Sequence, residues 1–342
     1  AIVAANASAG ADMIAFSAAL NGSPIQLTRV GDDNTAVNGD LDINDDVTIL
    51  GNGAANTLIQ GSSNAAFAGN MGDKAFGINQ DGTHTTLNVS ISNLTVRFTR
   101  NDIPVNAGFT QTGGAMDIFL TGTGAVPGPT TSLTNCTFDS NASALSYGGA
   151  INIDSGTVAA PMTNIYRGTV LISGCTISNN RTLSTVLAGD PPSGGGVNLF
   201  SDRHDVTFTS CSFTGNQTSS IISANGGGLN IRHSFGGTIT LTSCIVVNNT
   251  AGSDGGGILI AGVGGQTMIM TGGGITGNTA QGAGDSATGG GLFNGNPVGS
   301  TTLTGVTVSG NTATAGTTGR GGGIADGSTT PMAITNCIFS GN

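Results

Sequence analysis

The sequence predicts an all-β fold, a right-handed parallel β-helix with a short capping segment at its N-terminus. Two phrases alternate from about residue 91 to residue 342: a strand phrase with a Thr-x-Cys core that ends at an Asn, and a Gly-Gly-Gly-aliphatic phrase. Repeats with periods of about 20 to 50 residues are typical of solenoids. The unequal spacing of successive phrases indicates constant strands joined by loops of variable length.

The residue types of the repeated segments indicate strands rather than helices. Apolar and polar residues alternate in segments such as 151–153 and 229–231, which is the period of a half-buried strand. The 342 residues include 59 Gly, no Glu and a single lysine, Lys74, so the ordinary polar helix formers are missing. Coils of such strands, stacked about 4.8 Å apart, would build a rod.

Each phrase has a structural role in this fold. The Asn that ends a strand phrase tolerates a left-handed backbone at the turn, and its amide can hydrogen-bond the equivalent amide one coil away. The Gly residues let the backbones of neighbouring coils approach closely. The predicted ladder consists of Asn141, Asn180, Asn216, Asn249, Asn278, Asn311 and Asn342.

The cysteines all occupy one position of the strand phrase, which Leu94 and Val306 fill in other repeats. A position that accepts Leu and Val is an interior position, and stacked residues about 4.8 Å apart do not suit disulfide geometry. We therefore expect buried free thiols, while the odd number leaves one disulfide or a reactive thiol as alternatives. These residues are Cys136, Cys175, Cys211, Cys244 and Cys337.

A single domain, residues 1–342, accounts for the whole sequence. Residues 91–342 form regular repeat coils, and residues 1–90 form a cap and irregular coils, with helix-like composition only in residues 1–8. The strands expected in this first part are 13–16, 25–27, 40–44, 47–50, 57–60 and 87–91. We expect the last coil to be uncapped in this sequence, which stops directly after a turn Asn, so that either the natural protein continues or another copy covers this coil. We expect neither a secretory signal nor a membrane span in this sequence, because it opens without a basic segment or a long apolar run and no stretch approaches 18 apolar residues.

Residues 1–16, the segment 41–51 and the Gly-Gly-Gly-Ile and Cys-x-Phe-x-x-Asn repeats resemble bacterial surface proteins of the pectin-lyase-like superfamily. The chain looks especially like the group with polymorphic outer-membrane-protein repeats, often described as anchor-bearing or CSLREA-type β-helix proteins. The resemblance covers essentially the whole chain, and it implies a parallel β-helix and an extracellular or cell-surface location. It implies no particular activity, because a fold does not fix a function.

The strongest candidate for catalytic or metal-binding chemistry is the acidic segment 40–46. Polysaccharide hydrolases on this fold use paired carboxylates, and the lyases use an Asp-bound calcium ion with a basic residue. The segment lacks the Gly and the distal Glu of a calcium loop, so we expect a solvated strand face and turn, with a weak cation site as the alternative. The acidic residues concerned are Asp32, Asp33, Asp40, Asp42, Asp45 and Asp46.

Histidine adds few candidates. The compact group Arg203-His204-Asp205 lies between two expected strands, which predicts a turn with three solvated side chains. His84 and His233 are isolated, so we expect neither to bind a ligand or act in catalysis. We predict no catalytic, metal-binding or cofactor-binding residue, and we leave the binding residues unassigned.

With 19 acidic and 9 basic residues the net charge is −10, which repels nucleic acid and anionic membranes. A sparsely charged surface rich in Thr, Ser, Asn and Gly suits surface carbohydrate, other surface proteins or copies of the same chain. A Thr ladder suggests ice binding, but the sequence predicts a ladder one residue wide that ends at a bend, whereas a lattice needs a flat array of two columns. The ladder comprises Thr134, Ser173, Thr209, Thr242, Thr271, Thr304 and Thr335.

We predict an extracellular or cell-surface rod with a structural or adhesive function and without a catalytic site. End-to-end association into a filament is compatible with this function, because an uncapped coil exposes unpaired backbone and an apolar cross-section. The alternative is a polysaccharide lyase or glycoside hydrolase of the pectin-lyase-like fold, or a non-catalytic carbohydrate-binding remnant of one.

Overall fold

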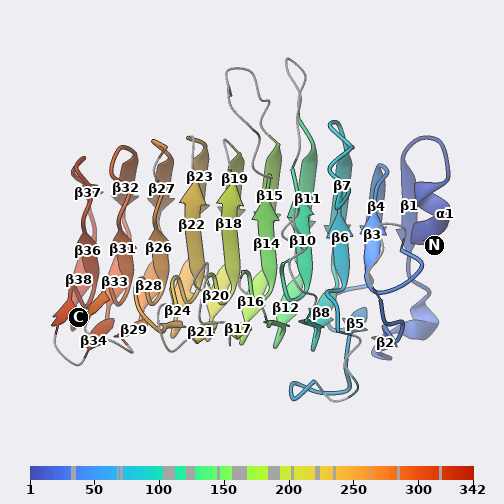
Figure 1. Ribbon diagram of the computed structural model, residues 1–342, viewed down its shortest axis with the longest axis horizontal. Coiled ribbons are helices and arrows are strands. Elements are labelled where there is room, and N and C mark those ends of the chain that lie inside the picture. Colours follow the sequence, from blue (N-terminus) through green and yellow to red (C-terminus); the bar gives the residue numbers. More distant parts are fainter. Residues whose placement is uncertain are drawn as a thin grey trace.

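The computed structural model is a parallel β-helix, a rod along which long sheets run side by side (Figure 1). Neighbouring strands are parallel, which confirms the predicted fold class, while the right-handed sense of the helix stays a prediction. The structure describes residues 1–31, 36–67, 69, 72–102, 112–120, 128–144, 147–155, 168–183, 193–201, 204–219, 224–233, 236–262, 264–282, 286–315 and 318–342.

Three long sheets make up the rod. Sheet A contains β1 (Asp12–Ala15), β4 (Val47–Leu50), β7 (Asn88–Ser92), β11 (Thr130–Thr134), β15 (Thr169–Ser173), β19 (Asp205–Thr209), β23 (Thr238–Thr242), β27 (Thr267–Thr271), β32 (Ser300–Thr304) and β37 (Ala333–Thr335). Sheet B contains β2 (Ile25–Gln26), β5 (Leu58–Gln60), β8 (Thr95–Arg97), β12 (Thr137–Asp139), β16 (Thr176–Ser178), β20 (Ser212–Thr214), β24 (Ile245–Val247), β28 (Gly274–Thr276), β33 (Thr307–Ser309) and β38 (Ile338–Ser340). Sheet C contains β3 (Leu41–Ile43), β6 (Phe76–Ile78), β10 (Met116–Phe119), β14 (Ile151–Asp154), β18 (Val197–Ser201), β22 (Leu229–His233), β26 (Ile258–Ile260), β31 (Leu292–Asn294) and β36 (Ile324–Asp326).

A shorter sheet follows the turn after sheet B. This sheet D contains β9 (Arg100–Asn101), β13 (Ala142–Ser143), β17 (Arg181–Leu183), β21 (Gln217–Ser219), β25 (Thr250–Ala251), β29 (Thr279–Gly282) and β34 (Thr312–Ala315). The strands β30 (Ser286–Thr288) and β35 (Thr318–Arg320) form a two-stranded sheet. One regular coil therefore passes through sheets A, B, D and C in turn. With 10 strands, sheet A is roughly 43 Å long at about 4.8 Å per step.

The N-terminal residues fold onto the first coil. A short helix, α1 (Ile2–Asn6), lies beside β1 at this end of the rod, and a 3-10 turn, η1 (Ala18–Leu20), follows β1 (Figure 1). Ile2 and Ala5 are buried in the core, and the Asn6 side chain donates to the carbonyl oxygen of Asp42 at 2.7 Å. The predicted capping segment and N-terminal strands are thus present. The sequence missed β6, because its central residue, Gly77, hides the alternation.

The cysteine column lies in the interior, between the inward side chains of sheets A and B. All five cysteines are free, as predicted, and Cys136, Cys175, Cys211 and Cys244 are buried. The prediction of burial is wrong for Cys337, which is only partly buried because no further coil packs on it.

The predicted Asn ladder is also present, at the corner between sheets B and D. The left-handed backbone expected of its residues lies instead at the residue before each of them, such as Asn179 with a φ of 56°. The Oδ1 of Asn216 accepts bonds from the backbone N and the Nδ2 of Asn180, at 3.1 and 2.9 Å. The same Nδ2 of Asn180 donates to the carbonyl oxygen of Phe138 at 2.9 Å. The ladder begins at Thr99, which donates to Asn141, and continues in this way to Asn342. Each amide therefore connects successive coils.

The Gly phrases pack against this ladder. A Cβ added to Gly228 would lie 3.1 Å from the amide carbon of Asn249, so the third Gly of the phrase makes room for the ladder. The first Gly lies over the outer side of sheet C: Gly226 has a φ of 62°, and a Cβ there would lie 2.9 Å from the Cβ of Asn230. The two phrases recognised in the sequence therefore interlock.

We expect a thiol reagent to label Cys337 in the native protein and all five cysteines after denaturation. Cys211→Val should lower the free energy of unfolding by less than about 1.5 kcal/mol in a urea titration, because it nearly conserves volume. Cys211→Asp should prevent folding, because it buries a carboxylate without a partner. Fewer than five thiols after denaturation without reductant would indicate a disulfide and contradict the structure.

Candidate functional site

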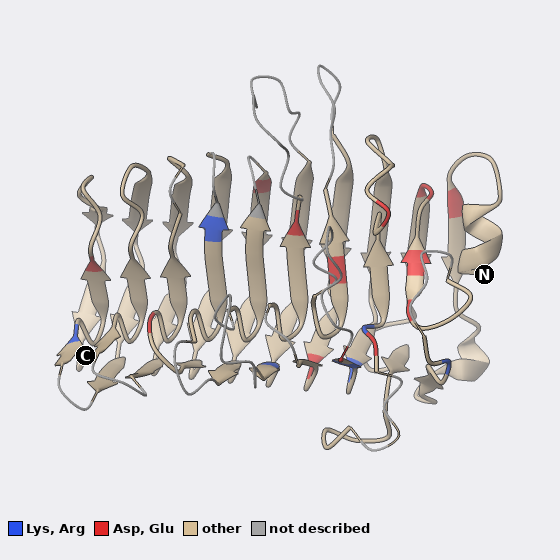
Figure 2. Ribbon diagram, in the orientation of Figure 1, with Lys and Arg blue, Asp and Glu red and all other residues tan. Residues whose placement is uncertain are grey.

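A buried charged cluster lies at the N-terminal end of the rod, on the outer side of sheet C. Lys74 is completely buried, and its Nζ lies 3.1 Å from Asp40 Oδ2 and 3.4 Å from Asp73 Oδ1. A buried lysine is costly unless carboxylates compensate its charge, so these contacts are required for folding. Elsewhere the charged residues are scattered along the rod (Figure 2).

Two further carboxyl groups belong to this cluster. Asp42 and Asp117 occupy the same register position in β3 and β10, with Gly77 of β6 between them. A Cβ on Gly77 would lie 2.7 Å from Asp42 Oδ1, so only glycine leaves room for the carboxyl group. Both aspartates are buried.

A row of buried asparagine side chains continues from this cluster along the rod. The Nδ2 of Asn152 donates to Asp117 Oδ1 at 2.8 Å. Asn198 and Asn230 extend the chain, each donating from Nδ2 to the Oδ1 of the preceding residue at 2.7 Å. All of these side chains are buried beneath turns such as the one at Gly226. This row of asparagines therefore connects successive coils.

Burial determines the charge state of the aspartates in the cluster. Burial raises the pKa of Asp117 to about 8, although Lys74 opposes this effect. Burial and the neighbouring Asp40 raise the pKa of Asp42 to about 8. Burial by itself would lower the pKa of Lys74, but Asp40 and Asp73 outweigh it and raise that pKa above its ordinary value. At neutral pH Lys74 is therefore charged, and Asp42 and Asp117 hold protons.

The expectation of a solvated face in the segment 40–46 is wrong for Asp40 and Asp42. Asp42 lies on the outer side of β3, as predicted, but Asp40 and Asp42 are only 2% and 1% exposed because turns cover them. Asp45 and Asp46 are partly buried in the turn before β4. Sequence reasoning missed Lys74 altogether, although its being the only lysine of the chain was a usable signal.

The prediction of a solvated turn at 203–205 is wrong for His204, which is 1% exposed. Its Nδ1 accepts a hydrogen bond from the backbone N of Gly168 at 3.2 Å. Asp205 begins β19, and its Oδ1 accepts from the backbone N of Thr238 at 2.9 Å. Both side chains therefore connect neighbouring coils. His84 lies on a partly exposed turn, with its Nε2 3.7 Å from Asp81 Oδ2.

Some candidates lie outside the described residues, namely Asp32, Asp33, Arg203 and the side chain of His233. Within the described ranges, no group of three or more His, Cys or acidic side chains is placed to hold a metal ion. The cysteine column lies in the core, where the contact with Cys136 and burial raise the pKa of the Cys175 thiol. That thiol therefore stays neutral.

The outer face of sheet A carries three parallel columns of short side chains. Strands pair in register, so equivalent residues of successive coils lie side by side. The column next to sheet B is Ser92, Thr134, Ser173, Thr209, Thr242, Thr271, Thr304 and Thr335. The middle column is Thr48, Ser90, Ser132, Leu171, Thr207, Thr240, Ile269 and Thr302. The third column is Asn88, Thr130, Thr169, Asp205, Thr238, Thr267 and Ser300.

The prediction of a Thr ladder one residue wide is therefore wrong. Residues at i, i+2 and i+4 of a strand face the same side, so Thr238, Thr240 and Thr242 of β23 all point outward, between buried Ile239 and Leu241. The signal was present in the sequence as a Thr-x-Thr-x-Thr pattern. This pattern runs across the rod, whereas the repeat of the strand phrase reveals only the column that runs along it.

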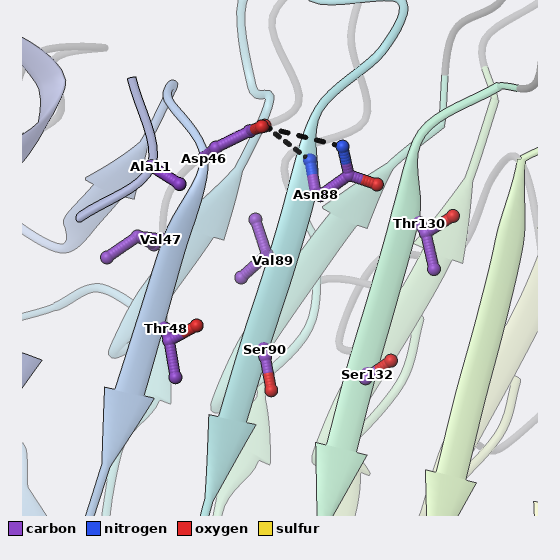
Figure 3. Close-up of a pocket in the computed structure, with 9 residues that line it drawn as sticks. All are labelled: Ala11, Asp46, Val47, Thr48, Asn88, Val89, Ser90, Thr130 and Ser132. Carbon is purple, nitrogen blue, oxygen red and sulfur yellow. Dashed lines mark hydrogen bonds between the residues drawn. The ribbon is translucent and has the colours of Figure 1, made fainter. Parts of the chain in front are cut away.

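A shallow depression of about 210 Å³ lies on this face near its N-terminal end (Figure 3). Thr48, Ser90 and Ser132, which belong to the middle column, line it on three neighbouring strands. At one end the side chain of Asp46 accepts from the backbone N of Asn88 at 2.8 Å. The depression thus follows the columns across the surface.

Comparison with known proteins shows no similar family model, curated protein or solved structure. The fold therefore rests on the geometry of the chain itself. In the part of the chain that the structure describes, none of the helices has the length and apolar character needed to cross a membrane.

We expect the free energy of unfolding to fall as the pH rises from about 4 to about 8. In this range native Asp42 and Asp117 hold protons that the unfolded chain, with pKa values near 3.8, has released, so rising pH favours unfolding. One such proton changes the stability by at most about 1.4 kcal/mol per pH unit. Asp117→Asn keeps an acceptor for Asn152 and removes one titration, so urea unfolding of this variant should depend less on pH. Equal pH slopes for the variant and the wild type would contradict the raised pKa.

Proposed function

We propose that this chain is an extracellular or cell-surface β-helical rod of the pectin-lyase-like group, with a structural or adhesive function and no catalytic site. The observation that carries the proposal is the outer face of sheet A, where three columns of short side chains extend over β7 to β32. Small-molecule sites are usually concave pockets, whereas this face is an extended repeat of short side chains with a shallow depression, which suits attachment to an extended surface.

The positions of the ionisable groups favour this function over catalysis. A glycoside hydrolase needs two carboxyl groups about 5 to 9.5 Å apart that face its substrate. Asp40, Asp42 and Asp117 instead lie in the buried cluster with Lys74, where a polymer on the surface would not contact them. The outer surface of the rod is therefore better suited to binding a polymer than to cleaving it.

We expect no lyase or hydrolase activity. Incubation of the chain with polygalacturonate, with and without calcium, should release neither unsaturated products nor new reducing ends. Replacing the partly buried pair in Asp45→Asn/Asp46→Asn should leave the melting temperature equally insensitive to calcium and to a chelator. Product release, together with a calcium-dependent rise in melting temperature that this double variant abolishes, would establish the polysaccharide lyase alternative.

End-to-end association is the second part of the proposal. Ile334 and Phe339 of the last coil occupy interior positions and are nevertheless 45% and 48% exposed, and α1 packs on the first coil at the opposite end. Contact between two last coils would cover this apolar surface and give a closed dimer, whereas contact with a first coil would propagate as a filament. We expect light scattering of the purified chain to show a mass that rises with concentration. A mass equal to one chain at all concentrations would refute the association.

A further inference from the structure

We propose that the extended surface bound by the outer face of sheet A is ice. This inference rests on the proposed function, because it names the ligand of the same face. Three features of the face favour ice: the two-dimensional spacing of its side chains, their chemistry, and the rigidity of the backbone beneath them.

The face is a lattice with two fixed repeats. Along the rod, β23, β27 and β32 pair in register over all of their residues, so each column advances by about 4.8 Å per coil. Across the rod, outward residues two apart in one strand are separated by about 6.7 Å. Both distances lie close to oxygen repeats on the faces of hexagonal ice. The side chains of neighbouring coils can therefore lie near lattice positions together.

Threonine has the chemistry that such a contact needs. Its branched side chain has few rotamers, so its hydroxyl and methyl groups keep fixed positions. In the described structure the hydroxyls of Thr209, Thr242 and Thr304 make no hydrogen bond within the protein, which leaves them available to water. Methyl groups order the water around them, and hydroxyls at lattice spacing can anchor this ordered layer.

The depression on the same face offers a place for ordered water. Its 210 Å³ give room for several ordered water molecules, and it follows the columns across β4, β7 and β11 (Figure 3). The hydroxyls of Thr48, Ser90 and Ser132 lie at successive positions along it, while Val47 and Val89 contribute to its floor. A row of water molecules held there would continue the outermost layer of an ice crystal.

The face is rigid before it meets a ligand. Each outward residue alternates with a buried one, as in β23, where Ile239 and Leu241 are completely buried. The Asn ladder holds successive coils in register at the corner beyond sheet B. A pre-ordered face loses little conformational entropy on binding, which matters for a ligand whose individual contacts are weak.

Crystalline polysaccharide is the competing ligand, and the face suits it less well. The outward positions of β7 to β32 include no aromatic residue on which a sugar ring could stack. Asp205 is the only charged residue among these positions, so a charged polymer would find no complementary patch. The interruptions of the columns are Asn88, Leu171, Asp205 and Ile269, and the column next to sheet B has none.

Two double variants test the proposal on the same coils. Thr209→Lys with Thr304→Lys adds two long charged side chains to sheet A. Thr214→Lys with Ser309→Lys adds them to sheet B, and all four positions are partly buried and face outward. The wild type and the sheet B variant should shape ice crystals and separate the freezing point from the melting point in a nanolitre osmometer. The sheet A variant should lose most of this separation, with all three proteins melting at similar temperatures.

A third variant tests for a gain. Leu171→Thr with Ile269→Thr fills two interruptions of the middle column, and both positions face outward, so the fold should be retained. We expect this variant to widen the gap between the freezing and melting points at equal protein concentration. An unchanged or narrower gap would contradict lattice matching by the middle column.

The outcomes separate the ligand from the proposed function. A wild type that neither shapes ice nor separates the two temperatures overturns the proposal, and so does an equal loss in both Lys variants. If the wild type instead adsorbs to insoluble cellulose or chitin and only the sheet A variant fails to do so, ice is the wrong ligand and the adhesive function stands. If the wild type binds none of these solids, the adhesive function loses its support as well.

Discussion

The buried amide ladder is the interaction on which the rest of the β-helix depends. Asn216 accepts two bonds from Asn180 and donates to Ile177 and Asn249, so its side chain serves three coils. Loss of one amide would leave several buried donors and acceptors without partners. Each such group would lower the free energy of unfolding by about 1 to 3 kcal/mol. The third Gly of each regular Gly phrase packs against the same amides, as Gly228 does against Asn249. Together these contacts fix each coil relative to the one before it.

A corner fixed in this way forces differences in repeat length to be absorbed elsewhere. Successive asparagines of the ladder are separated by as many as 39 positions, between Asn141 and Asn180, and by as few as 29, between Asn249 and Asn278. Sheet A nevertheless keeps its register through both steps, since β11 pairs with β15 and β23 with β27 without a shift. The regular face of sheet A is thus a consequence of the ladder, although the ladder lies at a different corner of the coil.

The sequence was sufficient for features that repeat at one position, and insufficient for features that depend on what covers a strand. The ladder Asn and the interior cysteines were predictable, because each position recurs in successive repeats. At the cysteine position, the occurrence of Leu94 and Val306 in other repeats reveals an apolar interior. Asp42 was correctly placed on the outer side of its strand, but its burial depends on turns that fold back over sheet C. Lys74 was missed for the same reason. Of the three columns of sheet A only the one next to sheet B was predictable, because Ser or Thr recurs there in every coil from β7 to β32, whereas other residues interrupt the remaining two.

The low charge of the chain follows from its fold and by itself identifies no ligand. In-register stacking places equivalent side chains about 4.8 Å apart, so a column of like charges would repel itself along the whole rod. Thr, Ser and Asn can fill such columns without this penalty, and sheet B is sparsely charged as well. Sheet B, however, has strands of two or three residues and exposes Ile245 and Ile338 among its hydroxyls. The width and continuity of the columns on sheet A, and not the absence of charge, therefore single out that face as the proposed binding surface.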